Sequence, residues 1–176
     1  MVMEDQEMVM NWRMLPEITK YMNTDPVLDI KKQKSWFETQ QKDDSCFHWI
    51  IEVDNIPIGV TSITMIDKKN GTCTRGTYIA VQEKRSFEII TSIYASQFDF
   101  VFDKLGLNKI EIQVFAENRN VVMLSKKCGF IQEGILREHI RKNDKYYDVV
   151  QLGMTRTDWK NKKKNWNYSS VKIIEN

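Results

Sequence analysis

Residues 117–134 read E-N-R-N-V-V-M-L-S-K-K-C-G-F-I-Q-E-G, and this pattern predicts a short helix between two strands. Inside it, apolar side chains recur at helical spacing, at Val121, Val122, Leu124 and Cys128. Gly129 lies where such a helix must end, and Phe130 begins an extended segment that runs to residue 140. The alternating run at residues 109–115 supplies the preceding strand. The stretch is therefore a strand–helix–strand unit with Asn118 at its first junction and Gly-Phe at its second.

The composition is typical of a soluble protein with a single domain. The chain has 176 residues, of which 41% are hydrophobic and 28% are charged. A net charge of +2 argues against nucleic acid or a membrane as the partner, because no strong field favours either. The basic run at residues 162–164, beside Trp166, keeps a nucleic-acid contact as a further alternative, although a short basic terminus is usually a solvated end.

Cysteine and histidine usage argues against disulfides and metal. Cys46, Cys73 and Cys128 are scattered and odd in number, which fits the reducing cytoplasm. The two histidines, His48 and His139, form no zinc-binding pattern with them. No apolar run approaches the roughly 18 residues that a membrane span needs. We therefore expect a cytoplasmic protein without a metal site.

Two helical regions are predicted in the first quarter of the chain. The apolar residues of segment 4–22 share one helical face, and Pro16 breaks this segment into two short helices. Residues 23–26 form a turn cluster. A second helix spans residues 31–41, with Trp36 on its inward face.

The strands that follow are separated by clear turn signals. Asp54-Asn55 and Lys69-Asn70-Gly71 mark hairpin turns. A long helix at residues 86–105 is closed by Gly106. The expected strands are residues 46–53, 56–66, 72–81, 109–115, 130–140 and 146–159. Three antiparallel strands followed by alternating helices and strands predict a mixed α/β sheet. We expect one domain at residues 1–160 and a polar, basic tail at residues 161–176.

This order of elements, together with Asn118 and Gly129-Phe130, resembles the GNAT superfamily of acyl-CoA-dependent N-acetyltransferases. The resemblance covers nearly the whole chain and implies the GNAT fold, an α/β/α arrangement in three layers. Family members usually begin with a strand, whereas only residues 1–3 precede the first helix here. Either the sheet lacks that edge strand or the chain start is short.

The resemblance implies acetyl-CoA as the acyl donor. In the family, a loop of the pattern Gln/Arg-x-x-Gly-x-Gly/Ala before the long helix holds the pyrophosphate on backbone amides. Here the loop is residues 81–88, V-Q-E-K-R-S-F-E, which has basic residues but no glycine. The amides of residues 84–88 are expected to take the anion at the helix N-terminus. The implied cofactor-binding residues are Ile79, Ala80, Val81, Lys84, Arg85, Ser86, Phe87, Asn118 and Ser125.

Three residues are candidates for the chemistry. The family often has a tyrosine acid four residues before the Gly-Phe glycine, and Ser125 stands there instead. Glu111 and Tyr78 are the candidate proton acceptors, although an amine with a low pKa needs no base. The alternative role of Glu111 is a paired surface carboxylate. Asn118 is equally suited to cap the helix that follows it.

The first helix and the last hairpin also resemble the flagellin-sugar N-acetyltransferases and the ribosomal-protein-acetylating branch of the superfamily. The motifs are Asn11-Trp-Arg-Met14, Tyr21-Met22 and Glu133-Gly-x-x-Arg137 with Asp148. The implied acceptor is the 4-amino group of a UDP-linked 4-amino-4,6-dideoxy sugar of the pseudaminic acid type. Its diphosphate and base would contact Trp12, Arg13 and Arg137. The alternatives are a protein N-terminus and a non-catalytic acyl-CoA-binding module, and a homodimer is left open.

Overall fold

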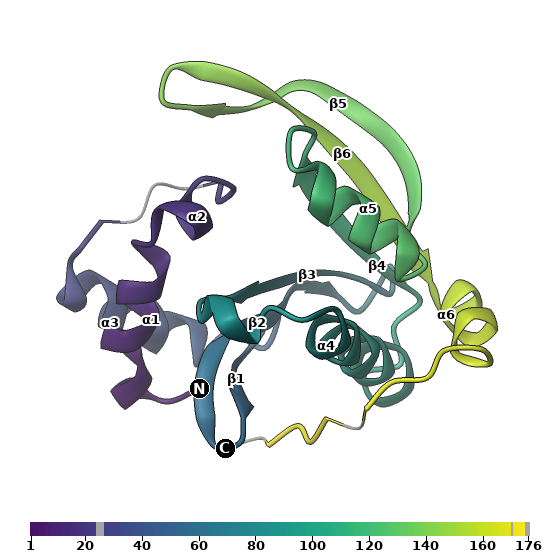
Figure 1. Ribbon diagram of the computed structural model, residues 1–176, viewed down its shortest axis with the longest axis horizontal. Helices are drawn as coiled ribbons and strands as arrows, with labels where there is room; N and C mark the ends of the chain where they lie inside the picture. The colour runs from purple at the N-terminus through teal and green to yellow at the C-terminus, as the bar shows by residue number, and fades with distance from the viewer. Residues whose placement is uncertain (24–26, 170, 175–176) are drawn as a thin grey trace.

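The computed structural model describes residues 1–23, 27–169 and 171–174, so most of the turn predicted at residues 23–26 lies outside the described part. A single six-stranded sheet of order β1-β2-β3-β4-β6-β5 organises the chain (Figure 1). Neighbouring strands are antiparallel except for β3 and β4, which are parallel, so the predicted mixed sheet is confirmed. The strands are β1 (Phe47–Val53), β2 (Ile56–Asp67), β3 (Thr72–Ile79), β4 (Lys109–Phe115), β5 (Ile131–Lys142) and β6 (Lys145–Thr155).

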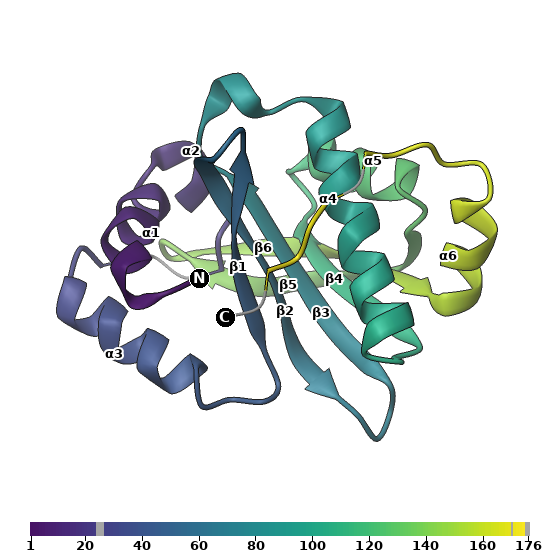
Figure 2. The ribbon, with the colours of Figure 1, turned by 90° about the horizontal axis from the view of Figure 1, so that it is seen from below.

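Helices cover both faces of this sheet. Figure 2 shows α1, α2 and α3 on one side and α4 and α5 on the other, which confirms the three layers. The α-helices are α1 (Gln6–Arg13), α2 (Pro16–Thr19), α3 (Ile30–Gln40), α4 (Phe87–Asp99), α5 (Arg119–Lys127) and α6 (Arg156–Lys163). Short helical turns are η1 (Met3–Asp5), η2 (Gln82–Lys84) and η3 (Phe100–Lys104), the last being a π-helical continuation of α4. Among the described residues, no helix is long and apolar enough to cross a membrane.

Turn chemistry fixes the hairpins where the sequence predicted them. Asp54 and Asn55 both adopt the left-handed conformation that a two-residue hairpin turn requires, as do Asn143 and Asp144. Gly129 ends α5 with a φ of +104°, and a Cβ there would lie 2.9 Å from the Met154 side chain. Glycine is favoured at that position because L side chains rarely adopt this conformation, and an added Cβ would also force the Met154 methyl group to move.

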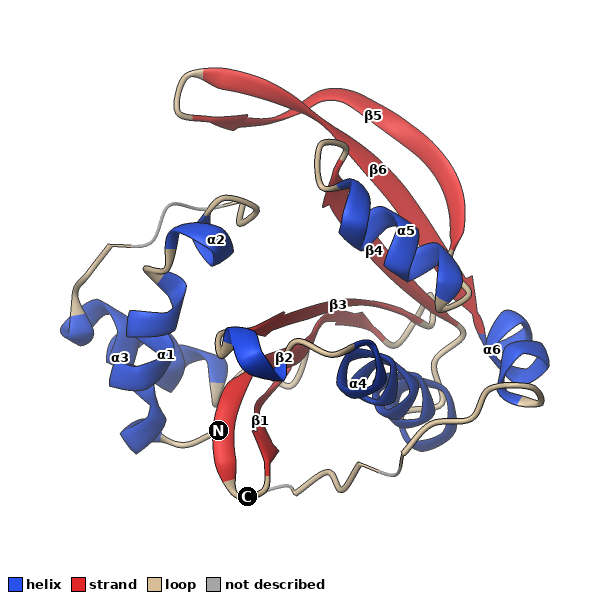
Figure 3. Ribbon diagram, viewed as in Figure 1, coloured by secondary structure: helices blue, strands red, loops and turns tan. Residues whose placement is uncertain are grey.

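The strand predicted at residues 146–159 is wrong in its last four residues. β6 ends at Thr155, and α6 begins at Arg156 with a reciprocal capping box between Thr155 and Asp158. Trp159 then lies in the core at 1% exposure and donates its indole N–H to Asp99 of α4 at 2.9 Å. The division into a domain ending at residue 160 and a tail stays a prediction, although α6 crosses that point (Figure 3).

The sheet begins, in the described part of the chain, with β1 at one edge. Residues 3–13 form η1 and α1 rather than a strand. Buried Gln6 accepts a hydrogen bond from Gln33 at 2.9 Å, which joins α1 to α3. This buried bond holds the two helices of the layer together.

Candidate active site

The central feature of the molecule is a gap between β3 and β4. These two strands pair at only three positions, Thr72↔Lys109, Cys73↔Ile110 and Thr74↔Glu111. Beyond them the strands diverge, as Figure 1 shows. A cavity of about 610 Å³ occupies the opening and is lined by residues 75–79 of β3 and 112–115 of β4. The sheet thus provides an elongated slot whose two walls are strand edges.

The main chain of β3 presents polar groups to this slot. The Ala80 N–H donates to Ile58 O at 2.7 Å, so alternation directs the peptide groups of Thr77 and Ile79 away from β2 and toward the slot. The paired segment with β4 ends before either residue. An extended amide chain can therefore hydrogen-bond there, which is the fit that the pantetheine arm of acetyl-CoA requires. Of the predicted strand-end contacts, only Ile79 lines the cavity, because the N–H groups of Ala80 and Val81 both bond Ile58 O.

The loop after β3 is more closed than the sequence predicted. The N–H groups of residues 84, 85 and 86 are bonded inside the loop to Val81 O, Gln82 O and Lys84 O. This happens because residues 82–84 form the tight turn η2. In the described part of the chain, the N–H groups of Phe87 and Glu88 have no hydrogen-bond acceptor, and they lie in the first turn of the 13-residue helix α4. They are the amides left for an anion.

The loop side chains divide between the cavity and solvent. Arg85 lines the cavity but folds back, donating its Nε–H to Ile79 O at 2.8 Å and lying 3.6 Å from Glu17. Lys84 lies 3.6 Å from Asp54, and Ser86 caps α4 by accepting from the Ile89 N–H at 3.1 Å. Phe87 is 62% exposed and does not line the cavity, so it leaves the slot open.

Asn118 lies at the β4 wall and Ser125 lies behind it. The Asn118 side chain accepts from the Val121 N–H at 3.4 Å, and the residue lines the cavity. Asn118 therefore caps α5 and lines the cavity at the same time. Ser125 is fully buried beneath the cavity, with its hydroxyl 3.4 Å from the Tyr94 hydroxyl. Tyr94 of α4, which the sequence did not single out, lines the cavity in its place.

The two candidate bases lie in different settings. Glu111 belongs to the paired part of β4, contacts Lys109 at 2.9 Å and does not line the cavity. Tyr78 does line the cavity, and its buried hydroxyl has no hydrogen-bond partner among the described residues. Burial raises the pKa of Tyr78, so the phenol stays protonated near neutral pH and can donate a hydrogen bond but not accept a proton. Neither position provides a general base in the slot.

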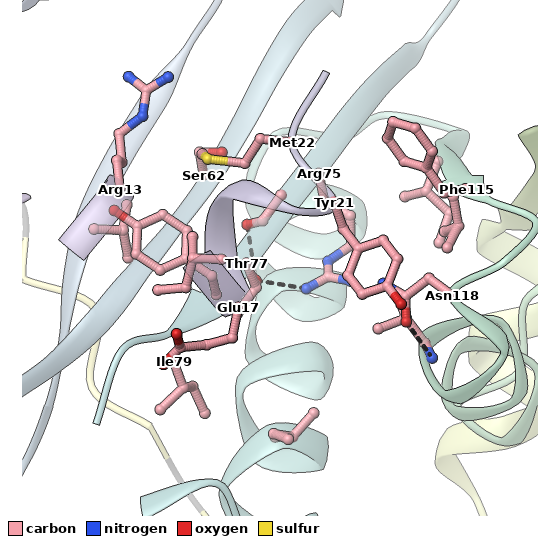
Figure 4. A pocket seen from close by; sticks show the side chains of 18 of the residues that line it. Arg13, Glu17, Tyr21, Met22, Ser62, Arg75, Thr77, Ile79, Phe115 and Asn118 are labelled. Carbon is pink, nitrogen blue, oxygen red and sulfur yellow. Dashed lines mark hydrogen bonds between the residues drawn. The ribbon is translucent and has the colours of Figure 1, made fainter. Parts of the chain in front are cut away.

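Of the predicted acceptor contacts, the structure brings only Arg13 to the cavity. Arg13 ends α1, Glu17 belongs to α2 and Tyr21 follows α2, and these three residues line one side of the cavity (Figure 4). Trp12 and Arg137 do not line it, and Arg137 is exposed on β5. Trp36 is 37% exposed rather than inward-facing, and its ring contacts His48 at a centroid distance of 5.3 Å. Both line the same opening, and burial lowers the pKa of His48.

Several residues of the cavity were missed by the sequence reasoning. Arg75, Thr77 and Tyr94 form its α4 side, and Glu17 and Gln113 contribute elsewhere. The alternation of residues 73–79 could have placed Arg75 on the core face of its strand, where a charge is unusual. No cluster of three or more histidine, cysteine, aspartate or glutamate residues suited to a metal occurs in the part of the chain that the structure describes.

Comparison with known proteins identifies the family. Residues 1–131 match the acetyltransferase (GNAT) domain family. The chain belongs to the GNAT acetyltransferase family. It is therefore an N-acetyltransferase, and the predicted acyl donor, acetyl-CoA, is confirmed, as is the predicted enzyme class.

Individual relatives agree with this assignment. The chain is 32% identical over 127 residues to the SPbeta prophage-derived uncharacterized N-acetyltransferase YokL of Bacillus subtilis, covering 72% of this chain and 71% of that one. It is 25% identical over 164 residues to the uncharacterized N-acetyltransferase p20 of Bacillus licheniformis, covering 90% and 92%. The fold also matches the spermidine N-acetyltransferase from Vibrio cholerae in complex with CoA and spermine. That match has a TM-score of 0.84 at 21% identity and covers 90% of this chain and 94% of that chain.

Proposed function

We propose that this N-acetyltransferase acetylates the primary amine of an anionic small molecule, with a nucleotide-linked amino sugar as the preferred acceptor. The carrying observation is the charge of the cavity wall. Arg13 lies on the acceptor side of the cavity, and Arg75 and Arg85 add positive charge along the rest of its wall, whereas Glu17 is the one carboxylate among the described lining residues. Glu17 is itself engaged by Gln82 at 2.9 Å and lies near Arg85. A diphosphate complements this wall because a guanidinium binds such an anion through charge-assisted hydrogen bonds.

The reaction proceeds by direct attack of the amine on the thioester. The pantetheine arm lies along β3 with the thioester near Thr77, and the acceptor enters from the opening beneath α1 and α2. The amine nitrogen forms the new C–N bond while the carbonyl oxygen takes negative charge that slot-facing N–H groups of β3 stabilise. The C–S bond then breaks with its electron pair on sulfur, and the amine proton passes to water. The products are the acetamide and CoA.

Aromatic side chains complete the acceptor opening. Tyr21 and Phe115 contact each other at a ring-centroid distance of 6.3 Å, and Phe115 contacts Tyr147 of β6 at 5.4 Å. Such a surface suits a sugar or base that needs an apolar wall. The donor capacity of the Tyr78 hydroxyl adds a polar contact beside Arg13. Together these groups recognise a ring that carries an anion.

A polyamine is the second candidate, because a solved protein of the same fold binds CoA and spermine. Polycation recognition requires several carboxylates, and the described wall of this cavity has only Glu17. A protein N-terminus is the third candidate. The charge of the wall favours the anionic acceptor over both. A homodimer, a cytoplasmic location and the amino-sugar branch of the family stay predictions.

Acceptor competition tests the proposal. CoA release is measured with acetyl-CoA and a UDP-linked 4-amino-4,6-dideoxy sugar, spermidine, or a peptide with a free N-terminus. The sugar nucleotide is expected to give the highest kcat/KM, at least tenfold above the others. Arg13→Gln is expected to raise KM for the sugar nucleotide and leave KM for spermidine unchanged. A higher kcat/KM for spermidine would overturn the acceptor assignment while leaving acetyl transfer intact.

A further inference from the structure

Arg75 places a positive charge at the point where β3 and β4 separate. It directly follows Thr74, the last β3 residue paired with β4, and it lines the cavity although it is only 7% exposed. Figure 4 shows its guanidinium beside Thr77 at the base of the slot. Alternation places the side chains of Arg75, Thr77 and Ile79 on the α4 face of the sheet, opposite Tyr78 and the acceptor opening. Arg75 is therefore on the donor side of the reaction.

Neutral groups hold this guanidinium in a fixed orientation. Its Nε–H donates to Gln97 Oε1 at 2.6 Å, and one Nη2–H donates to Thr77 Oγ1 at 2.6 Å. Its Cζ lies 3.6 Å from the centroid of the Tyr94 ring. Gln97 is in turn anchored to Ser62 O at 3.1 Å. The side chain is thus preorganised on a helix and a strand rather than left to move in a loop.

No carboxylate of the described residues forms an ion pair with Arg75. Burying a charge without a counterion is unfavourable, and hydrogen bonds to neutral groups offset only part of that cost. The hydrogen bonds of this side chain to neutral groups use Nε and Nη2. An anion that arrives in the slot would offset this cost, and acetyl transfer generates one when the C–S bond breaks.

We propose that Arg75 stabilises the CoA thiolate as it leaves, a role that rests on the acetyl-transfer reaction proposed above. The C–N bond forms at the thioester carbon, and the C–S electron pair moves to sulfur. The negative sulfur is held beside the Arg75 guanidinium, and the proton lost by the amine goes to water. The thiolate takes a proton from water on release, so that the products are acetamide and CoA thiol. No acid is required at the position of Ser125.

The test follows the thiol of bound CoA, without any acceptor present. The pKa of the thiol is measured by thiolate ultraviolet absorbance in free CoA, in the wild-type complex and in the Arg75→Met complex. Methionine keeps comparable length and removes the charge. The thiol pKa is expected to be lower in the wild-type complex than in free CoA and to return to or above the free value in Arg75→Met. Turnover of Arg75→Met with acetyl-CoA is expected to fall about 100-fold, while the Kd for CoA measured below the thiol pKa changes less than threefold.

Two further variants separate charge from structure. Arg75→Lys keeps the positive charge but loses the planar guanidinium with its paired N–H donors. It is expected to show a thiol pKa and a turnover between those of the wild type and Arg75→Met. Arg156→Met, which removes a half-buried arginine bonded to Leu107 O at 2.7 Å, is the matched control and is expected to behave as wild type. A thiol pKa in the wild-type complex that equals or exceeds the pKa in free CoA overturns the proposal. This measurement uses the wild-type protein alone, so it does not depend on whether any variant folds. Failure of the wild-type protein to bind CoA would overturn both acetyl transfer and the role of Arg75. An error in the acceptor assignment alone would affect neither.

Discussion

The same two strands behave in opposite ways along their length. In the closed half, residues 72–74 and 109–111 pair in register. In the open half, residues 75–79 and 112–115 face each other across the cavity. Cys73 and Ile110 of the closed half are 2% and 0% exposed and pack in the main core. In the open half, Arg75 and the slot-facing main-chain groups of β3 line the cavity, although Ile112 and Val114 still pack in the same core. The comparison indicates that one half fixes the separation of the strands and the other uses it.

The same substitution at two positions of β4 tests whether the two halves differ, and it is expected to have the largest effect. Ile110 and Ile112 lie on one face, two residues apart, but only Ile112 lines the cavity. Ile110→Ala leaves a void in packed core and is expected to cost about 4 kcal/mol of unfolding free energy, against about 2 kcal/mol for Ile112→Ala. Urea denaturation measures both. Acetyl-CoA affinity is expected to fall in folded Ile112→Ala, and equal costs would contradict the division into two halves.

Gly59 of β2 tests how the open half is positioned. A Cβ at Gly59 would lie 2.2 Å from Tyr78 O and 2.9 Å from Ile79 Cα, so the β3 backbone must move. Gly59→Ala is expected to cost about 2 kcal/mol and to weaken acetyl-CoA binding at least tenfold. Gly134→Ala on β5 is the control, because nothing lies within 4 Å of its Cβ. Normal CoA binding by folded Gly59→Ala would show that the slot tolerates a shift of β3.

Asn118 tests whether the β4 wall binds the donor or merely starts a helix. Asn118→Ala removes a cap on α5, and Asp29→Ala removes the cap on α3, which accepts from Lys31 and Lys32 at 3.0 and 3.1 Å. Both are expected to cost about 1 kcal/mol in thermal unfolding. Only Asn118→Ala is expected to raise the Kd for acetyl-CoA in calorimetry, by about tenfold, or 1.4 kcal/mol. An unchanged Kd would assign Asn118 to capping alone.

Ser125 is expected to show the smallest effect. Its hydroxyl is buried behind Tyr94 and does not line the cavity. Ser125→Ala should therefore change kcat less than tenfold, or about 1.4 kcal/mol of barrier. A steady-state assay of CoA release measures this. A larger loss would mean that the serine and Tyr94 hydroxyls act together on the leaving sulfur.

Local signals predicted most of the fold. The Asp54-Asn55 turn, the α5 helix and its end at Gly129 all follow from residue types whose preferred backbone conformations are strong. The end of β6 was missed because the predicted strand was carried through the polar residues 155–158 to Trp159, although Thr155 and Asp158 have the spacing of a capping box.

The site was less predictable, because it depends on where two strands separate. The alternation of side chains along β3 predicts which face of the sheet Arg75 lies on. It does not predict that β3 and β4 pair at only three positions. The inward fold of Arg85 onto Ile79 O arises from a tight turn that the glycine-free loop did not reveal. Arg13 and Asn118, which the sequence named as acceptor and cofactor contacts, both line the cavity, and these two roles stay predictions.

Amide hydrogen exchange, resolved by residue in NMR with and without CoA, tests the central claim most directly. Binding in the slot is expected to slow exchange at Thr77 and Ile79, whose peptide groups face the gap. Exchange at residues 72–74 and 109–111 is expected to stay unchanged, because those peptide groups are already paired. Slowed exchange confined to the closed half, or none at Thr77 and Ile79 when CoA is bound, would contradict the account.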